Sequence, residues 1–377
     1  MNKATKQISK LFAAMVLAGV ASHSFAADTI KIGIAGPKTG PVAQYGDMQF
    51  SGAKMAIEQI NAKGGVNGKK LEAVEYDDAC DPKQAVAVAN KVVNDGVKYV
   101  VGHLCSSSTQ PASDIYEDEG VIMITPAATS PDITARGYKM VFRTIGLDNA
   151  QGPAAARYIA QLKPTNVAVL HDKQQYGEGI ASSVKDILGK EGIKVAMFEG
   201  INVGERDYSS ILAKLKQANV DFVYFGGYHP EMGLLLRQAK EKGLTARFMG
   251  PEGVGNDSIS QIAKDASEGM LVTLPKSFDQ DPANKALVEA FEAKKENPSG
   301  PFVLPSYSAV EVIAGGIAAA KSEDPEKVAE AIHKGTFKTP TGDLSFDEKG
   351  DLKDFQFVVY EWHYGKPKSV AGENAGL

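Results

Sequence analysis

The sequence lacks long apolar stretches, basic runs and internal repeats. After the first 26 residues no stretch reaches about 18 uninterrupted apolar residues, so we expect no membrane-spanning helix there. Lysine and arginine do not cluster, and the 377-residue chain carries a net charge of −5, which argues against a nucleic-acid partner. Without a repeat or a low-complexity segment, a solenoid or a disordered chain is not expected either.

Motifs of common enzyme and metal sites are also missing. The histidines do not stand at zinc spacing, no Gly-x-Ser-x-Gly pattern occurs, and the turn at 64–70 lacks the glycine spacing and final hydroxyl of a phosphate-binding loop. One alternative is an exported hydrolase in which Ser106 acts with a histidine such as His103, although hydroxyls that cap a helix explain the same cluster. We expect a protein that is not an enzyme and that carries neither a metal nor a cofactor.

The first 26 residues have the pattern of a secretory signal peptide. Lys3, Lys6 and Lys10 form a basic start, residues 11–21 form an apolar segment, and a small-residue site ends at Ala26. The apolar segment is too short to span a bilayer as a permanent helix. We therefore expect cleavage after Ala26 and an exported, soluble mature chain.

Only two cysteines occur, Cys80 and Cys105. Export places them in a compartment where disulfides persist, so we expect them to pair. Closing a loop of about 25 residues would stabilise the fold by roughly 3.5 kcal/mol in the chain-entropy description. The alternative is two buried free thiols.

Short β-rich runs alternate with helical patterns along most of the chain. This alternation is typical of parallel sheets with right-handed crossovers, and the length suffices for two such units. The expected fold class is therefore α/β, with two Rossmann-like lobes that each contain a parallel central sheet. Further helices are expected near 283–296, 307–320 and 325–334, and residues 342–359 predict a hairpin that turns at 347–350.

Several predicted strands end in a loop that carries a conspicuous polar or aromatic residue. In an open α/β sheet such loops meet at one crevice. Four hydroxyl residues at 106–109 precede a helical pattern, and a helix start of this kind suits a small anion, here a carboxylate rather than a phosphate. A glutamate among glycines suits a cationic group, although a surface glutamate and half-buried tyrosines are the alternatives. The six residues are Tyr45, Ser106, Thr129, Tyr176, Tyr228 and Glu252.

From about Ile30 to its C-terminus, the chain resembles the periplasmic leucine/isoleucine/valine-binding proteins of bacterial ABC importers. The resemblance implies a type I periplasmic binding protein fold whose hinge the chain crosses three times, near residues 147, 276 and 353. The lobes would then comprise 27–147 plus 277–353 and 148–276 plus 354–377. The segments that carry the resemblance are GPVAQYG at 40–46, YDDACDPK at 76–83, GHLCSSSTQP at 102–111, ITPAAT at 124–129, HDKQQYG at 171–177, GGYHPE at 226–231 and GPEG at 250–253.

The resemblance also implies a set of ligand contacts. It places the carboxylate of an amino acid against Ser106 and Thr129, and the ammonium group against Glu252, Thr129 and the carbonyl of Ala127. Tyr176 and Tyr228 would complete the site from the second lobe. The aliphatic side chain would lie among Tyr45, Leu104, Cys105 in its disulfide with Cys80, Ala128 and Phe302. Within the family, a tyrosine at position 45 accompanies a broad branched-chain preference, and a tryptophan accompanies leucine alone.

The implied function is capture of free leucine, isoleucine and valine in the periplasm and delivery to the membrane permease of an ABC importer. We expect a monomer. The expected walls carry no charge that would hold a polar side chain, and one methylene group changes binding by only about 1–3 kcal/mol, so the three ligands should overlap. Alternatives are a binding protein for another small aliphatic amino acid, a chemosensory role and the hydrolase described above.

Overall fold

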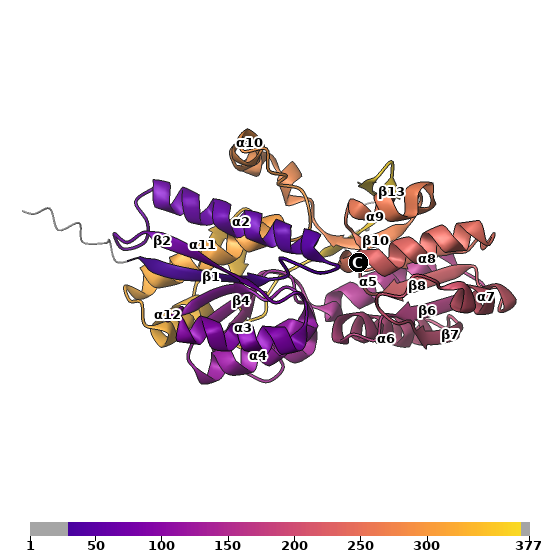
Figure 1. Cartoon of the computed structure of the whole chain (residues 1–377), viewed down its shortest axis with the longest axis horizontal. Coiled ribbons are helices and arrows are strands. Elements are labelled where there is room, and N and C mark those ends of the chain that lie inside the picture. Colours follow the sequence, from indigo (N-terminus) through magenta and orange to yellow (C-terminus); the bar gives the residue numbers. More distant parts are fainter. Residues whose placement is uncertain (1–28, 371–377) are drawn as a thin grey trace, which may run out of the picture.

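The computed structural model describes residues 29–370 as two α/β lobes that lie side by side (Figure 1). The first lobe contains a five-stranded parallel sheet of order β2-β1-β3-β4-β5. Its strands are β1 (Ile30–Gly36), β2 (Leu71–Asp77), β3 (Tyr99–Gly102), β4 (Ile122–Thr125) and β5 (Val141–Arg143).

Helices cover both faces of this first sheet. Side chains alternate between the two faces of a strand, and in β3 the neighbours Val100 and Val101 enter different core clusters. One face packs against α2 (Ala43–Ala62), α11 (Val303–Ala320) and α12 (Pro325–Lys334); the other packs against α3 (Pro82–Asn94) and α4 (Ser106–Asp118). With both faces buried, the central strands β3 and β4 are buried along their whole length rather than alternating, whereas edge strand β2 carries charged residues.

The second lobe contains a seven-stranded sheet of order β14-β13-β10-β9-β8-β6-β7. The strands from β10 to β7 are parallel, and β13 and β14 add an antiparallel edge. Helices α5 (Asp148–Leu162) and α6 (Gln175–Lys190) cover one face; α7 (Ser209–Gln217), α8 (His229–Glu241) and α9 (Ser258–Ala263) cover the other. The strands are β6 (Val167–His171), β7 (Val195–Gly200), β8 (Phe222–Gly226), β9 (Arg247–Gly250), β10 (Leu271–Pro275), β13 (Phe357–His363) and β14 (Lys366–Ser369).

The chain passes between the lobes three times. It leaves the first sheet after β5, returns from β10 through α10 (Lys285–Ala293) to the first core, and crosses again to place β13 in the second sheet. Two lobes joined by three crossings confirm the expected fold class. Among the described residues, only α11 is long and apolar enough to cross a membrane, and 72% of it is buried, which fits a core helix of the first lobe.

One expected element is wrong. No hairpin joins residues 342–359: β12 (Gly342–Ser345) pairs with β11 (Thr336–Thr339), whereas β13 pairs with β10 in the other lobe. The expected turn exists, because Phe346 and Leu352 form an antiparallel bridge around it. Both flanking runs are therefore strands, and each has a different partner.

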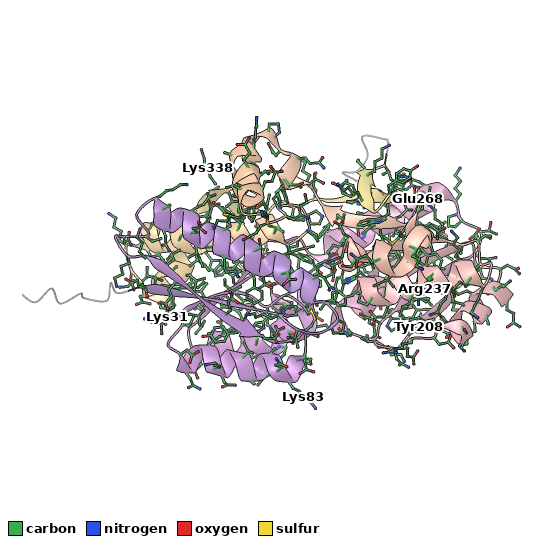
Figure 2. All side chains as sticks on the ribbon, turned by 45° about the horizontal axis from the view of Figure 1, so that its top comes forward. Lys31, Lys83, Tyr208, Arg237, Glu268 and Lys338 are labelled. Atoms are coloured by element: carbon green, nitrogen blue, oxygen red, sulfur yellow. A yellow bond between two sulfur atoms is a disulfide. The ribbon has the colours of Figure 1, made fainter. Side chains whose placement is uncertain are left out.

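Both lobes carry charged side chains on their outer surfaces. Figure 2 labels Lys31, Lys83 and Lys338 on the first lobe and Glu268 on the second, and all four are exposed. Buried apolar side chains form the cores of the two lobes and a further cluster between the lobes, which contains several of the expected site residues.

Candidate functional site

Loops from both lobes line a small, partly open cavity whose water-accessible volume is about 10 Å³. Seven of the expected contact residues line it, and one further residue, Gly253, was not expected. The lining consists of Leu104, Ser106, Ala127, Tyr176, Tyr228, Glu252, Gly253 and Phe302. Tyr45 and Cys105 belong to the same apolar cluster between the lobes, and Cys80 packs against it.

The junction of β3 and α4 forms the floor of the cavity. Gly102 ends β3 at a φ of 143°, and a Cβ there would lie 2.1 Å from the carbonyl oxygen of Ala35, so only glycine fits. Cys105 occupies the N-cap position of α4, and Ser106 is the first residue of this 13-residue helix. The start of α4 therefore presents backbone N–H groups and the positive end of a helix dipole beside the cavity.

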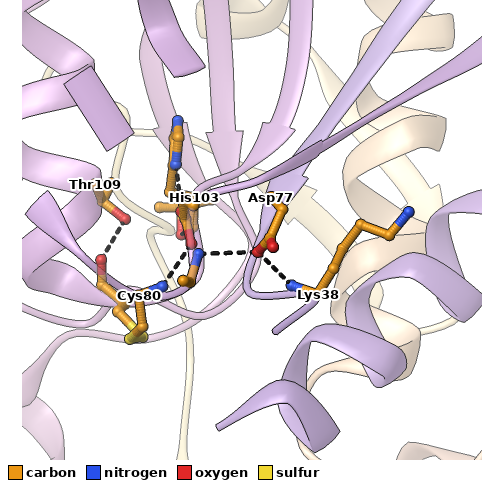
Figure 3. Close-up of a disulfide and its surroundings, with 9 residues drawn as sticks. Lys38, Asp77, Cys80, His103 and Thr109 are labelled. Carbon is orange, nitrogen blue, oxygen red and sulfur yellow. Dashed lines mark hydrogen bonds and ion pairs between the residues drawn. A yellow bond between two sulfur atoms is a disulfide. The ribbon is translucent and has the colours of Figure 1, made fainter. Parts of the chain in front are cut away.

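A disulfide joins Cys80 to Cys105, as expected, with a Cα–Cα distance of 5.6 Å (Figure 3). Behind it, the amide of Cys80 donates to Asp78 Oδ1 at 2.8 Å, and Asp78 Oδ2 lies 2.5 Å from His103 Nδ1. His103 Nε2 lies 3.0 Å from the hydroxyl of Tyr116. This buried network and the disulfide together fix the loop that carries Leu104.

The same network argues against a hydrolase. Both ring nitrogens of His103 are occupied by Asp78 and Tyr116, and Ser106 Oγ accepts a hydrogen bond from Ser130 N at 3.3 Å. His103 is therefore not placed to take a proton from Ser106. Within residues 29–370, no three His, Cys, Asp or Glu side chains are grouped so that they could hold a metal ion.

A buried arginine shapes the second loop, which follows β4 and contains Ala127, Ala128 and Thr129. Arg143 donates to the carbonyl oxygens of Ala128 at 2.6 Å and Ser130 at 3.2 Å, and its Nε lies 2.6 Å from Asp351 Oδ1. Burial lowers the pKa of Arg143, but Asp351 opposes this effect. The arginine thus holds the loop from behind, while the Thr129 hydroxyl stays buried without a hydrogen-bond partner.

Aromatic residues connect the two lobes. The hydroxyl of Tyr45, on α2, donates across the cleft to the carbonyl oxygens of Glu252 at 3.2 Å and Gly253 at 2.9 Å. Its ring packs edge-on against Phe302, with centroids 5.1 Å apart. On the second lobe the rings of Tyr176 and Tyr228 lie 5.3 Å apart.

Glu252 is the acidic residue of the cavity. It begins a short 3-10 helix after β9, is only 2% exposed, and its Oε2 has no hydrogen-bond partner. Burial raises its pKa to about 8, and the nearby carboxylate of Asp148 adds to the rise. The cavity therefore combines a desolvated carboxyl, a helix start and apolar walls, which suits a small zwitterion.

The sequence profile described as "Periplasmic binding protein" matches residues 29–366. The chain belongs to the periplasmic binding protein family. Members of this family are solute-binding proteins, not enzymes.

Two relatives illustrate how similar these proteins are. A Pseudomonas aeruginosa "Leucine-, isoleucine-, valine-, threonine-, and alanine-binding protein" is 71% identical over 364 residues, covering 96% of this chain and 98% of its own. An Escherichia coli "Leu/Ile/Val-binding protein" is 57% identical over 353 residues, covering 92% and 96%.

Solved structures show the same fold. A leucine binding protein from Thermotoga maritima superposes with a TM-score of 0.85 at 28% identity, covering 91% of this chain and 98% of its own. A branched-chain amino acid transporter substrate binding protein from Streptococcus pneumoniae, in complex with isoleucine, superposes with a TM-score of 0.82 at 27% identity and the same coverage.

One residue that lines the cavity, Gly253, and one buried carboxyl near it, Asp148, were not expected from the sequence. A Cβ at Gly253 would lie 2.6 Å from the carbonyl oxygen of Gly227 and 2.9 Å from the ring of Tyr176, so this position has no room for a side chain. Asp148 is only 3% exposed although it follows the first crossing between the lobes. Nothing local in the sequence distinguishes Asp148 from an ordinary acidic residue in the first turn of a helix.

Proposed function

We propose that this chain is the solute-binding component of an ABC importer, which captures leucine, isoleucine and valine between its lobes and delivers them to a membrane permease. One observation carries the proposal: the carboxyl of Glu252, whose Oε2 has no hydrogen-bond partner, and the start of α4 line the same small cavity. The names of the similar proteins support the same ligand class.

The carboxylate of the ligand would lie at the start of α4. There the hydroxyl of Ser106, the neighbouring backbone N–H groups and the unpartnered Thr129 hydroxyl are the available donors. The positive end of the helix dipole favours an anion at this point. The disulfide and the Asp78–His103 pair fix the loop before the ligand arrives, so little ordering is needed on binding.

The ammonium group would meet Glu252, Thr129 and the carbonyl oxygen of Ala127. An ammonium group has three donors and no acceptor, and buried Glu252 Oε2 lacks a donor. The pKa of about 8 means that a cation at this place lets Glu252 ionise where burial alone would oppose it.

The aliphatic side chain would contact Leu104 and Phe302, with Tyr45 and Cys105 in its disulfide with Cys80 behind them. Ala128 completes the proposed set, and its side chain packs into the core of the first lobe. These groups offer no fixed charge, so selection would depend on size and shape. The Pseudomonas relative is named for threonine and alanine as well, and these two amino acids belong in the ligand panel.

Ligand contacts to both lobes would favour the closed arrangement, so affinity includes the free energy of closure. We propose lobes of 27–147 plus 277–353 and 148–276 plus 354–377, with hinges near 147, 276 and 353. Export to the periplasm after cleavage at Ala26, and a monomeric state, belong to the same proposal. The proposed signal peptide lies outside the described residues, as does part of the C-terminal segment.

Glu252→Gln tests the proposal. This variant imitates the protonated carboxyl, so the ligand-free protein should fold and remain as stable as the wild type. Leucine affinity should fall at least about 100-fold, because a buried charge-assisted hydrogen bond is lost and the ammonium group is left without its counter-charge. Isothermal titration calorimetry measures both proteins.

Glu311→Gln is the matched control. Glu311 lies on α11 outside the cavity, and burial raises its pKa to about 7. Its removal should leave leucine affinity unchanged. Unchanged affinity in Glu252→Gln would instead show that Glu252 does not bind the ammonium group.

A further inference from the structure

A second buried carboxyl, that of Asp148, lies beside the proposed ammonium site. Asp148 begins α5 directly after the chain leaves β5, and its backbone N–H donates to the carbonyl oxygen of Thr129 at 3.0 Å. It is 3% exposed, and its Oδ1 has no hydrogen-bond partner. Helix α5 thus brings a desolvated carboxyl to the loop that carries the unpartnered Thr129 hydroxyl.

Little positive charge offsets this cluster of oxygens. Within residues 29–370, Arg143 is the cation that acts on Asp148, and the groups that act on Glu252 include no cation. The arginine that acts on Asp148, Arg143, is already paired with Asp351 and donates to two backbone carbonyl groups. The buried oxygens here without a close hydrogen-bond partner are Glu252 Oε2, Asp148 Oδ1, Thr129 Oγ1 and Gln151 Oε1. Weaker hydrogen bonds act within the cluster: the Thr129 hydroxyl lowers the pKa of Asp148, and Gln151 and Tyr176 lower that of Glu252.

We propose that Asp148 is a second carboxylate of the ammonium site, and that it shares one proton with Glu252 which the incoming ammonium group displaces to the solvent. Two buried carboxyls that share only one arginine, already paired with Asp351, cannot both ionise at low cost, so one proton stays with the pair. A ligand ammonium group supplies the missing positive charge and three donors. This inference rests on the proposed function.

Charge balances in this exchange. Before binding, two carboxylates and one proton give the cluster a charge of about −1; after binding, two carboxylates and one ammonium group give the same charge, and the proton has left for bulk water. The buried cluster therefore takes up a cation without a change in its net charge. This avoids the large free-energy cost of burying an additional charge.

The pKa values of Asp148 and Glu252 agree with a proton held by the pair. Burial raises the pKa of Asp148 to about 7, against the effects of the Thr129 hydroxyl and Arg143. Burial raises the pKa of Glu252 to about 8, and Asp148 contributes to this rise. The proton of the pair is therefore retained near neutral pH, where it can be exchanged.

Among the other titratable groups around the pair, Asp172 has a pKa in the same range, because burial raises it to about 7. Asp172 acts on Tyr228 and remains in Asp148→Asn, so only the change in proton release caused by that variant is assigned to the pair. Burial raises the pKa of four tyrosines far above neutral pH: Tyr45, Tyr176, Tyr224 and Tyr228. Burial lowers the pKa of His229 to about 4, and Asp257, whose pKa burial raises, lies near Lys366. Between about pH 6 and about pH 8 the ligand's own ammonium group also stays protonated.

Calorimetry tests the proposal directly. Leucine is titrated into the full mature protein at about pH 7.5 in two buffers of very different ionisation enthalpy, and the difference in heat gives the number of protons released. We expect release of about one proton per leucine. By linkage, leucine affinity should then rise with pH between about pH 7 and about pH 8, by about tenfold.

Asp148→Asn is the informative variant. It should still bind leucine, but proton release should fall at least about twofold and the pH dependence of affinity should flatten. Glu311→Gln, which removes a half-buried carboxyl outside the site, should leave proton release as in the wild type. If Asp148→Asn does not fold, carboxyl NMR of the wild type decides, because Asp148 should be ionised in the leucine complex and titrate near neutral pH without ligand.

Different results would contradict the shared proton and the proposed function. Leucine binding without proton release in the wild type, or with unchanged release in Asp148→Asn, would overturn the shared-proton proposal and leave the proposed function standing. Absence of amino-acid binding in the wild type would remove the proposed function itself.

Discussion

Removal of the Tyr45 hydroxyl should weaken every ligand by the same factor. Tyr45 Oη donates to the carbonyl oxygens of Glu252 at 3.2 Å and Gly253 at 2.9 Å, so its hydrogen bonds join one lobe to the other. In Tyr45→Phe the ring keeps its packing against Phe302, and only the link between the lobes is lost. The variant therefore acts on closure.

The structure sets the size of the effect. Tyr45 is fully buried, and the two carbonyl groups would be left without this donor in the closed protein. A buried polar group deprived of its partner costs about 1–3 kcal/mol, which corresponds to a loss of affinity of about 5- to 150-fold. Because the closed state is destabilised whichever ligand is bound, leucine, isoleucine and valine should lose affinity equally.

Calorimetry with the three ligands is the assay, and Tyr307→Phe is the control. The hydroxyl of Tyr307 donates to Gln59 Oε1 at 2.9 Å inside the first lobe. That variant should lose some stability and keep its affinities. A Tyr45→Phe protein with wild-type affinities, or with a changed order of preference among the ligands, would refute the role of Tyr45 in closure.

Three further predictions concern stability and fit. Replacing Cys80 and Cys105 together by alanine should lower the free energy of unfolding by about 3.5 kcal/mol in denaturant titrations, and an unchanged value would contradict a stabilising disulfide. Gly253→Ala should bind leucine more weakly in calorimetry, because its Cβ would meet the carbonyl oxygen of Gly227 and the ring of Tyr176, which lines the cavity; unchanged affinity would show that Tyr176 can shift without cost. Without ligand, the melting temperature should fall from about pH 6 to about pH 9, since Asp148 and Glu252 have folded-state pKa values of about 7 and about 8. Such raised values stabilise the fold at low pH and lose that contribution as the pH rises through them, so a melting temperature that rises over this range would contradict the assignment.

Local sequence patterns predict most of this fold because strand and helix periodicities are local properties. They fail where the partner of a strand is decided at long range. Residues 342–359 show this: the turn at 347–350 forms, but β12 pairs with β11, and β13 pairs with β10 about 85 residues earlier in the chain. Turn chemistry fixes a reversal of the chain and leaves the choice of sheet open.

The candidate site also contains residues that the sequence predicts and a neighbouring residue that it does not. Ser106, Tyr228 and Glu252 were predicted because residues that follow parallel strands meet at one edge of a sheet. The burial of Asp148 depends on the approach of α5 to the loop after β4 and on an arginine already occupied by Asp351. Contacts between segments that lie far apart in the chain leave no pattern in a single sequence.

Titration of free amino acids into the refolded protein tests the central claim most directly. The mature chain is unfolded in denaturant, dialysed to remove any carried-over ligand, refolded and titrated with leucine, isoleucine and valine. We predict one binding site for each of the three, and no binding of lysine or aspartate, whose charged side chains would be buried against apolar walls. Heats indistinguishable from dilution for all three branched-chain ligands would contradict the proposed function.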